Sequence, residues 1–348
     1  MQKPIKLIFL LLALASLTLI LPQPTPTFAK DCGVTAVGFT PLNDLGTGTY
    51  QGFQGGLYPN GSNEPPSEHA QAGLALAQSI QPLNGTGQVD LVNGRVVLLS
   101  LGMSNTSLEF VAFGTLAQND ALLSDAVTLV NGAQSGKSAE FASDPDDDFW
   151  TVLDERLANN GVTPQQVQVV WLKEARADVH PDEIFPTDAE ILQDQLRSIV
   201  QIAKARFPNL KIAYLSSRIY AGYADTLLSP EPEAYQSGFA VKWLIAEQIN
   251  GSPELNYDPA AGAVLAPWLA WGPYLWADGL TPRSDGLVWL CGDFVNDGTH
   301  PSGDGAFKVG QQLLDFFHTD ATAVPWYLNL AQLPPQQYLP LILSNSAP

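Results

Sequence analysis

The chain has 348 residues, of which 45% are hydrophobic and 15% charged, and its formal net charge is −19 at pH 7. This composition excludes a disordered chain and is sufficient for the core of one large domain. The excess of carboxylates also argues against nucleic acid as a partner, because phosphate backbones bind through clusters of lysine and arginine.

Residues 1–29 have the pattern of a secretory signal peptide. Lys3 and Lys6 form a basic start, an apolar run covers 7–21, and Thr27-Phe28-Ala29 is a small-residue cleavage site. The alternative is a membrane anchor, but the apolar run has about 15 residues and a spanning helix needs roughly 20. We expect a secreted or extracytoplasmic protein without stable membrane insertion after cleavage. Its mature charge is 14 basic minus 35 acidic residues, or −21.

Three further segments are distinguished by composition. Residues 30–94 are rich in glycine, proline and asparagine up to Leu83, with a short helix predicted over 69–80, and we expect a loop layer packed on the core. The main domain is predicted to span 95–320. Residues 321–348 are expected to form an extended C-terminal tail, because their last part is rich in proline, leucine and glutamine.

The first strong element of the main domain is the apolar run 96–101. A short apolar run without alternation is typical of a strand that is covered on both faces. The run ends at Gly102 and is followed by Ser104. Because ligands bind at the carboxyl ends of strands in parallel sheets, Ser104 is a candidate nucleophile. The alternative is that Ser104 caps a helix that begins near Ser107.

After Ser104, predicted strands and helices alternate along the chain. Strands are expected at 126–130, 167–172, 211–216 and 287–290, and helices at 108–117, 149–158, 188–207, 235–249 and 303–317. This alternation implies right-handed crossovers between parallel strands. The predicted fold class is therefore α/β, a three-layer α/β/α sandwich with a central parallel sheet of about five strands.

Two side chains follow the later strands and are candidates for the substrate rim. Arg218 comes directly after the predicted strand 211–216, where an arginine is suited to an anionic substrate or a carboxylate neighbour. Trp271 lies in a tryptophan-rich run, which is suited to stacking on sugar rings, to core packing or to a capping loop.

The only two cysteines, Cys32 and Cys291, lie near opposite ends of the mature chain. An oxidising compartment favours a disulfide between them, although spacing alone does not bring them together. If this disulfide forms, it holds the loop that follows Cys291.

That loop contains Asp297-Gly298-Thr299-His300, just before the last predicted helix. An aspartate three residues before a histidine can accept a hydrogen bond from one ring nitrogen while the other nitrogen faces a nucleophile. Asp297 could alternatively be only a turn former, since Asp-Gly is a common turn. With Ser104 upstream, the pattern predicts a Ser104, His300 and Asp297 triad.

These motifs resemble the SGNH (GDSL-like) esterases, whose fold is flavodoxin-like. The first block, 101–106, looks most like the sialate O-acetylesterase branch, and Asp297 to Ser302 matches the closing Asp-x-x-His block. By this resemblance Gly132, after the second strand, would donate its amide to the oxyanion hole together with the amide of Ser104. The alternative for Gly132 is an ordinary strand-to-helix turn.

The chain departs from the family at the third block, where Lys173 and Ala175 stand in place of Gly-x-Asn. Lys173 is therefore a candidate donor to the oxyanion, with a surface pair to Glu174 as the alternative. The resemblance implies a serine esterase that hydrolyses acyl esters, first of all acetyl esters on a small molecule or polysaccharide, without a metal or organic cofactor. Two alternatives stay open, a lipase or thioesterase on the same fold and a catalytically weak or inactive glycan-binding protein.

Overall fold

The computed structural model describes residues 29–177 and 183–329, so the predicted signal peptide before Ala29 lies outside the described residues. Its centre is a parallel sheet in the order β4-β3-β5-β6-β7. The strands are β3 (Val96–Gly102), β4 (Val127–Asn131), β5 (Val167–Lys173), β6 (Ile212–Leu215) and β7 (Trp268–Trp271). Numbered along this sheet, the order is 2-1-3-4-5, which is the flavodoxin-like arrangement predicted from the sequence.

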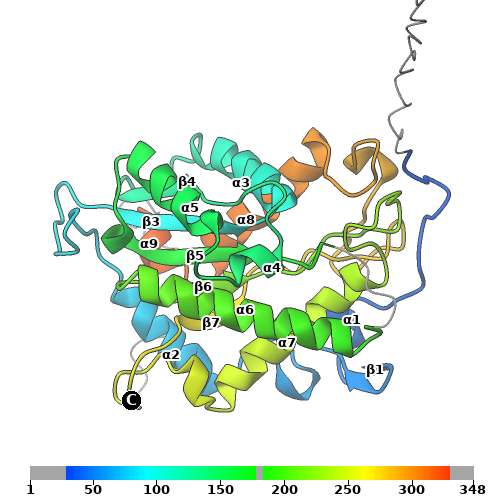
Figure 1. Cartoon of the computed structure of the whole chain (residues 1–348), viewed down its shortest axis with the longest axis horizontal. Coiled ribbons are helices and arrows are strands. Elements are labelled where there is room, and N and C mark those ends of the chain that lie inside the picture. The colour runs from blue at the N-terminus through cyan, green and yellow to red at the C-terminus, as the bar shows by residue number, and fades with distance from the viewer. Residues whose placement is uncertain (1–28, 178–182, 330–348) are drawn as a thin grey trace, which may run out of the picture.

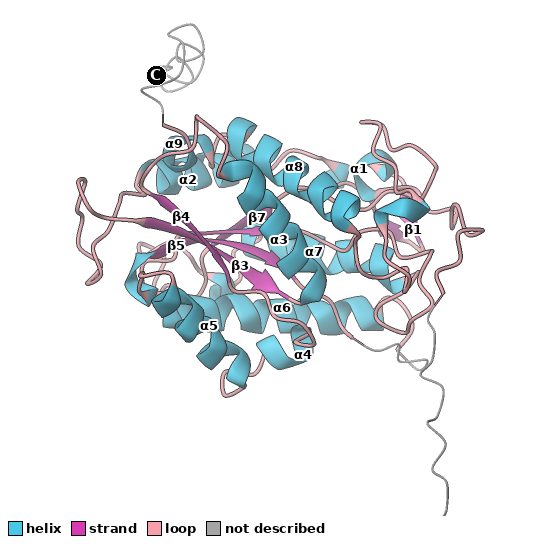
Figure 2. Cartoon of the chain, turned by 90° about the horizontal axis from the view of Figure 1, so that it is seen from above, coloured by secondary structure: helices cyan, strands magenta, loops and turns pink. Residues whose placement is uncertain are grey.

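Helices cover both faces of the sheet and complete the three layers (Figures 1 and 2). One face carries α2, α3, α8 and α9, and the other carries α4, α5 and α6, with α7 packed against α6 and β7. The helices are α1 (Leu42–Leu45), α2 (Ser67–Gln78), α3 (Ser104–Ala117), α4 (Ala139–Ala142), α5 (Asp148–Asn159), α6 (Thr187–Arg206), α7 (Glu233–Ile249), α8 (Gly303–Thr319) and α9 (Val324–Tyr327). Of these, none has both the length and the apolarity needed to cross a bilayer.

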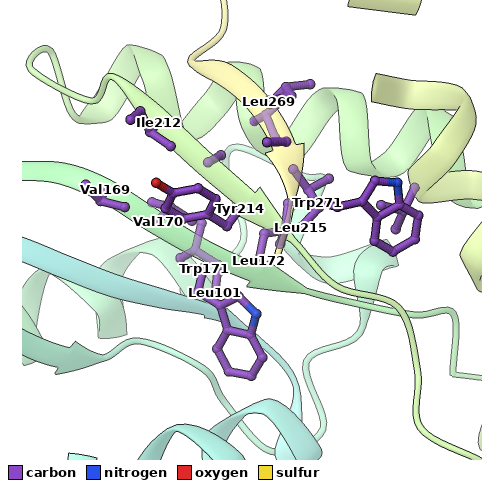
Figure 3. Packing of buried hydrophobic residues seen from close by; sticks show 14 of the residues in the cluster. Leu101, Val169, Val170, Trp171, Leu172, Ile212, Tyr214, Leu215, Leu269 and Trp271 are labelled. Carbon is purple, nitrogen blue, oxygen red and sulfur yellow. The ribbon is translucent and has the colours of Figure 1, made fainter. Parts of the chain in front are cut away.

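The central strands are buried along their whole length, as their continuous apolar runs predict. Figure 3 shows the side chains of β5, β6 and β7 packed together, among them Val169, Tyr214 and Leu269. The Trp171 ring stacks on Phe110 of α3, with 6.0 Å between ring centroids. This packing fixes α3 against the sheet, and therefore fixes the direction in which α3 begins.

The prediction of the fifth strand was wrong in its position. Residues 287–290 are irregular and Leu290 is half exposed, whereas the fifth strand is β7, in the tryptophan-rich run. All four β7 residues are buried, and Leu269 and Trp271 pair with Ala213 and Leu215 of β6. The prolines that flank this run made it resemble a loop, although its four central residues form a short buried edge strand.

The segment 30–94 contributes α1, α2 and a two-stranded hairpin, β1 (Thr49–Tyr50) and β2 (Phe53–Gln54), and several of its side chains enter the main core. At the other end, 321–329 does not form the extended tail that we expected. Those residues contain α9, in which Trp326 and Tyr327 are buried against Phe317. Aromatic burial therefore outweighs the proline-rich composition there, and the rest of the predicted tail lies outside the described residues.

Candidate active site

Ser104 is the first residue of α3, two residues beyond the end of β3. Met103 occupies the N-cap position, so Ser104 does not cap the helix. Its hydroxyl instead lies 2.7 Å from Nε2 of His300. The start of a helix directs free N–H groups and a partial positive charge towards this point, which favours negative charge near the serine.

Asp297 accepts hydrogen bonds from both the ring and the backbone of His300. Its Oδ2 lies 2.7 Å from the ring Nδ1 of His300, and its Oδ1 accepts from the N–H groups of Thr299 and His300 at 2.9 and 3.0 Å. Burial raises the pKa of the Asp297 carboxyl, but these donors outweigh burial and hold the pKa below its usual range. An ionised Asp297 keeps the proton of His300 on Nδ1, so that Nε2 can accept the proton of Ser104.

The loop that carries Asp297 and His300 is held in place by local backbone contacts. Val295 donates its N–H to the carbonyl of His300, and Gly298 has a φ of +66°. A Cβ at Gly298 would lie 2.0 Å from the carbonyl oxygen of Tyr223, so this turn requires glycine. Asn105 of α3 adds a direct link, because its Nδ2 donates to the carbonyl of Thr299 at 3.0 Å.

A disulfide joins Cys32 to Cys291, with 5.5 Å between their Cα atoms. Cys291 lies six residues before Asp297, in a short 3-10 turn over Cys291–Asp293. Lys30 adds to this attachment, since its Nζ donates to the carbonyls of Cys291 and Phe294 and its backbone N–H donates to the carbonyl of Asn296. The start of the described chain therefore holds the histidine loop from its outer side.

The two amides predicted for the oxyanion hole differ in their surroundings. The N–H of Ser104 lies in the first turn of α3, where a helix offers no internal acceptor. The N–H of Gly132 donates to Ser100 Oγ at 3.2 Å inside the core, and a Cβ there would lie 2.5 Å from the Ser100 carbonyl. Gly132 thus allows β4 to approach β3 closely, and its amide is not available to an oxyanion.

The exposed turn 135–136 follows Gly132 in the chain. It is held over the end of β3 because Gln134 donates its N–H to the carbonyl of Gly102.

Lys173 also has a role that the sequence did not predict. It is neither paired with Glu174 nor free to donate as we expected, because its ammonium group donates to both carboxylate oxygens of Glu109, each at 2.7 Å. Both side chains are almost fully buried. Burial lowers the pKa of Lys173 and raises that of Glu109, and each partner opposes the effect of burial on the other. With Thr106 Oγ1 donating to the Lys173 carbonyl, the pair fixes the first two turns of α3 to β5.

Replacing Lys173 by methionine is expected to lower the free energy of unfolding by about 3–5 kcal/mol, because it leaves the Glu109 carboxylate buried without its partner. Urea unfolding measures this loss. Lys137→Met is the matched control, since Lys137 pairs with Asp147 near the surface and its loss should cost less than about 1 kcal/mol. Equal losses in the two variants would contradict a stabilising role of the buried pair.

The two residues predicted for the substrate rim are both buried. Trp271 is 4% exposed, and its indole N–H donates to the carbonyl of Leu57 at 2.7 Å. It belongs to the edge strand β7, which β5 and β6 separate from β3. Arg218 follows β6 as expected but is 2% exposed. Core packing therefore accounts for Trp271, and Arg218 lies beneath the surface.

Glu231 is a partly buried residue near this region that the sequence did not reveal. It accepts hydrogen bonds from the backbone N–H groups of Ala221 and Tyr235 and from the indole of Trp276. Burial raises its pKa from 4.5 to about 7, although these donors and the charge of Arg218 oppose the rise. Glu231 therefore keeps its proton in the folded protein at a pH at which it is ionised in the unfolded chain.

This raised pKa predicts that stability falls as the pH increases from about 4.5 to 7. The folded state binds more protons than the unfolded state over this window, so the loss attributable to Glu231 should reach about 3 kcal/mol. Urea unfolding at pH 5 and pH 8 measures it, with Glu231→Gln as the comparison. The variant should lose less stability than the wild type over this range. Identical losses would contradict the raised pKa.

No group of three or more histidine, cysteine, aspartate or glutamate side chains is arranged to hold a metal ion within 29–177 and 183–329.

Comparisons with known proteins give a likeness of fold only. No protein-family model matches the chain, and no curated protein matches it. Similar solved structures include a candidate acylhydrolase of Bacteroides fragilis, 14% identical over 71% of this chain and 92% of its own, with a TM-score of 0.35. A GDSL-like lipase of Bacteroides thetaiotaomicron is 10% identical over 71% and 95%, with a TM-score of 0.34. The C-terminal catalytic domain of Streptococcus pneumoniae peptidoglycan O-acetyltransferase A is 13% identical over 65% and 94%, with a TM-score of 0.31. At these scores the likenesses assign no activity, and none of the three supports a preference for sialate esters.

Proposed function

We propose that this protein is a secreted serine esterase of the SGNH type that hydrolyses acyl esters. The observation that carries the proposal is the line of hydrogen bonds from Ser104 Oγ through His300 to Asp297, with 2.7 Å at each step. The three side chains come from the start of α3 and from one loop at the same edge of a flavodoxin-like sheet, and this is the edge at which such sheets bind ligands. Nucleophile, base and orienting carboxylate therefore stand in the order that acyl transfer requires.

In the proposed reaction, Ser104 Oγ attacks the carbonyl carbon of the ester while His300 Nε2 takes the serine proton. The tetrahedral intermediate collapses with cleavage of the bond to the alkoxy oxygen, and His300 returns the proton to the leaving alcohol. Water then attacks the acyl-serine and loses a proton to His300. The bond between the acyl carbon and Ser104 Oγ then breaks, His300 returns its proton to Ser104 Oγ, and the carboxylic acid leaves, so the net reaction consumes one water per ester.

The oxyanion of each intermediate would accept hydrogen bonds from the N–H of Ser104 and from the turn 135–136 in place of Gly132. Neither N–H of that turn donates to an acceptor within the described part of the chain, and the turn is exposed next to the end of β3. Each such donor typically contributes about 3–4 kcal/mol to transition-state stabilisation. Lys173 has no part in this oxyanion hole, because Glu109 engages its ammonium group.

We also propose that the protein is secreted and that its substrate is an acetyl ester of a carbohydrate. The basic and apolar pattern of 1–29 and the Cys32 to Cys291 disulfide both suit an oxidising compartment. The acyl group is inferred from the resemblance of the first and last sequence blocks. A sialate-specific site is not part of the proposal.

Initial rates on 4-nitrophenyl acetate, butyrate and palmitate, together with acetate release from acetylated xylan, test this function. We expect the acetate ester to be the best of the three chromogenic substrates, with measurable acetate release from the polymer. Preference for palmitate would favour a lipase on the same fold. Absence of hydrolysis of every ester would contradict the proposed activity.

A further inference from the structure

Three buried polar atoms at the carboxyl edge of the sheet have no hydrogen-bond partner among the residues that the structure describes. They are Oε1 of Glu174, Oγ of Ser217 and Nε of Arg218. Their residues are 2%, 1% and 2% exposed, respectively. Leaving a buried donor or acceptor unpaired costs about 1–3 kcal/mol, and more for a charged group. Buried groups of this kind are rare in native proteins and call for an explanation such as a functional role.

The three residues are neighbours of the nucleophile by strand register. Gly102 of β3 pairs with Lys173 of β5, and Leu172 of β5 pairs with Leu215 of β6. Ser104, Glu174 and the Ser217-Arg218 pair therefore leave three adjacent strands at one edge of the sheet.

Contacts of the loop after β6 connect Arg218 to the catalytic histidine loop. The guanidinium of Arg218 donates from Nη2 to the carbonyl of Leu228 at 3.4 Å, which is long for a hydrogen bond. Two residues earlier, Thr226 Oγ1 lies 2.6 Å from Thr299 Oγ1, and Asp225 donates its N–H to the carbonyl of Asp297. One short loop thus contacts both Arg218 and the segment that carries His300.

Each of the three groups has a form that can donate a hydrogen bond. Burial raises the pKa of Glu174 well above its ordinary value and Glu140 adds to the rise, while the N–H of Ala175 and the charges of Lys173 and Arg218 oppose it, so burial favours the protonated form, which has a proton to donate. Ser217 has a hydroxyl proton, and Arg218 has a planar fork of N–H groups with a positive charge. Three donors and one cation match a carboxylate better than they match a neutral hydroxyl or an amine.

We infer that Glu174, Ser217 and Arg218 form a subsite for a carboxylate of the ester substrate, beside Ser104. This inference rests on the proposed esterase function and narrows it to esters that carry a negatively charged carboxylate, with an acidic sugar as the first candidate. Arg218 provides the charge and Glu174 and Ser217 provide neutral donors. The excess of acidic residues in the chain does not prevent this, because Arg218 supplies a positive charge at the subsite, where Glu109, Glu231, Glu174 and Asp297 also act on it.

The test compares two acetylated sugars that differ only at C6, methyl glucuronoside and methyl glucoside. Acetate release by the wild type should show a kcat/KM at least about tenfold higher for the uronoside, the size expected of one charge-assisted hydrogen bond. A second pair, 4-nitrophenyl hydrogen succinate and 4-nitrophenyl butyrate, places the carboxylate in the acyl group instead. A tenfold preference for the charged ester in either pair supports the subsite, and its absence in both pairs overturns it.

Variants then assign the preference to these residues. Arg218→Gln should reduce the ratio of charged to neutral kcat/KM to near one, whereas Arg218→Lys should retain part of it. Arg206→Gln is the matched control, because Arg206 pairs with Asp154 on the outer helices. A ratio that Arg218→Gln leaves unchanged would contradict the inference. If Arg218→Gln does not fold, a competition experiment with the wild-type protein replaces it. Methyl glucuronoside should inhibit hydrolysis of 4-nitrophenyl acetate at least tenfold more strongly than methyl glucoside. Equal inhibition by the two sugars would contradict the subsite.

The experiments distinguish failure of the proposed esterase function from failure of the carboxylate subsite. If neither neutral nor charged esters are hydrolysed, the esterase function itself is wrong. If both are hydrolysed at equal kcat/KM, the esterase function stands and only the carboxylate subsite is wrong.

Discussion

Replacing Ser104 by alanine should reduce ester hydrolysis by about 10⁶-fold in kcat, to the level of the assay background. The variant removes the one oxygen that lies 2.7 Å from His300 Nε2, and with it the atom that would form the acyl intermediate. Hydrolysis of 4-nitrophenyl acetate under saturating conditions measures the effect. Folding should be retained, because the hydroxyl is at the start of α3 and makes no hydrogen bond other than that to His300 among the described residues.

The control for this variant is Ser107→Ala, one helical turn further along α3. Ser107 Oγ accepts a hydrogen bond from Asn131 at 2.9 Å and has no link to His300. Its variant should keep kcat within a few-fold of the wild type. Activity of Ser104→Ala comparable to that of Ser107→Ala would exclude Ser104 as the nucleophile.

Replacing Asp297 by asparagine should lower kcat by about 10⁴-fold at neutral pH. An asparagine amide can donate to Nδ1 of His300, which would move the ring proton to Nε2 and leave no base to accept the proton of Ser104. The geometry of the loop should survive, since an amide oxygen can still accept from the N–H groups of Thr299 and His300. A pH profile of kcat from 5 to 9 measures the loss.

A second aspartate and histidine pair provides the matched control. Asp120 Oδ2 lies 2.6 Å from Nε2 of His318, with the histidine at the end of α8 and no serine in the pair. Asp120→Asn makes the same chemical change away from Ser104 and should leave kcat within a few-fold. A similar loss in both variants would show that the effect is structural and not catalytic.

The sequence was sufficient for the fold class and for most of the element positions. The continuous apolar runs at 96–101 and 167–172 predicted the central strands within one residue, because strands buried on both faces need no polar alternation. Helix α6 was predicted within a residue at each end, since it has acidic residues in its first turn and ends before Pro208. The edge strand β7 was missed because a strand of four residues, with Pro267 directly before it and Pro273 shortly after it, gives too short a pattern.

In the candidate site, local patterns were more informative than single residues. The spacing of Asp297 and His300 fits one tight loop, so sequence could predict that the carboxylate reaches the ring. The roles of four other candidate residues depend on tertiary neighbours that no short motif encodes. These residues are Gly132, Lys173, Arg218 and Trp271. One feature of the sequence could have indicated that Lys173 has a buried partner. Glu109 is a single carboxylate beside Leu108 and Phe110 in an apolar helix, and a buried charge there needs a partner.

Covalent labelling is the most direct test of whether Ser104 is the nucleophile. The protein is treated with a fluorophosphonate, digested and mapped by mass spectrometry, so that the modified residue is read without reference to any substrate. We expect one phosphonyl group per chain, located on Ser104, with labelling strongly slowed in Asp297→Asn and unchanged in Asp120→Asn. No adduct in the folded wild type, or an adduct on another residue, would contradict it.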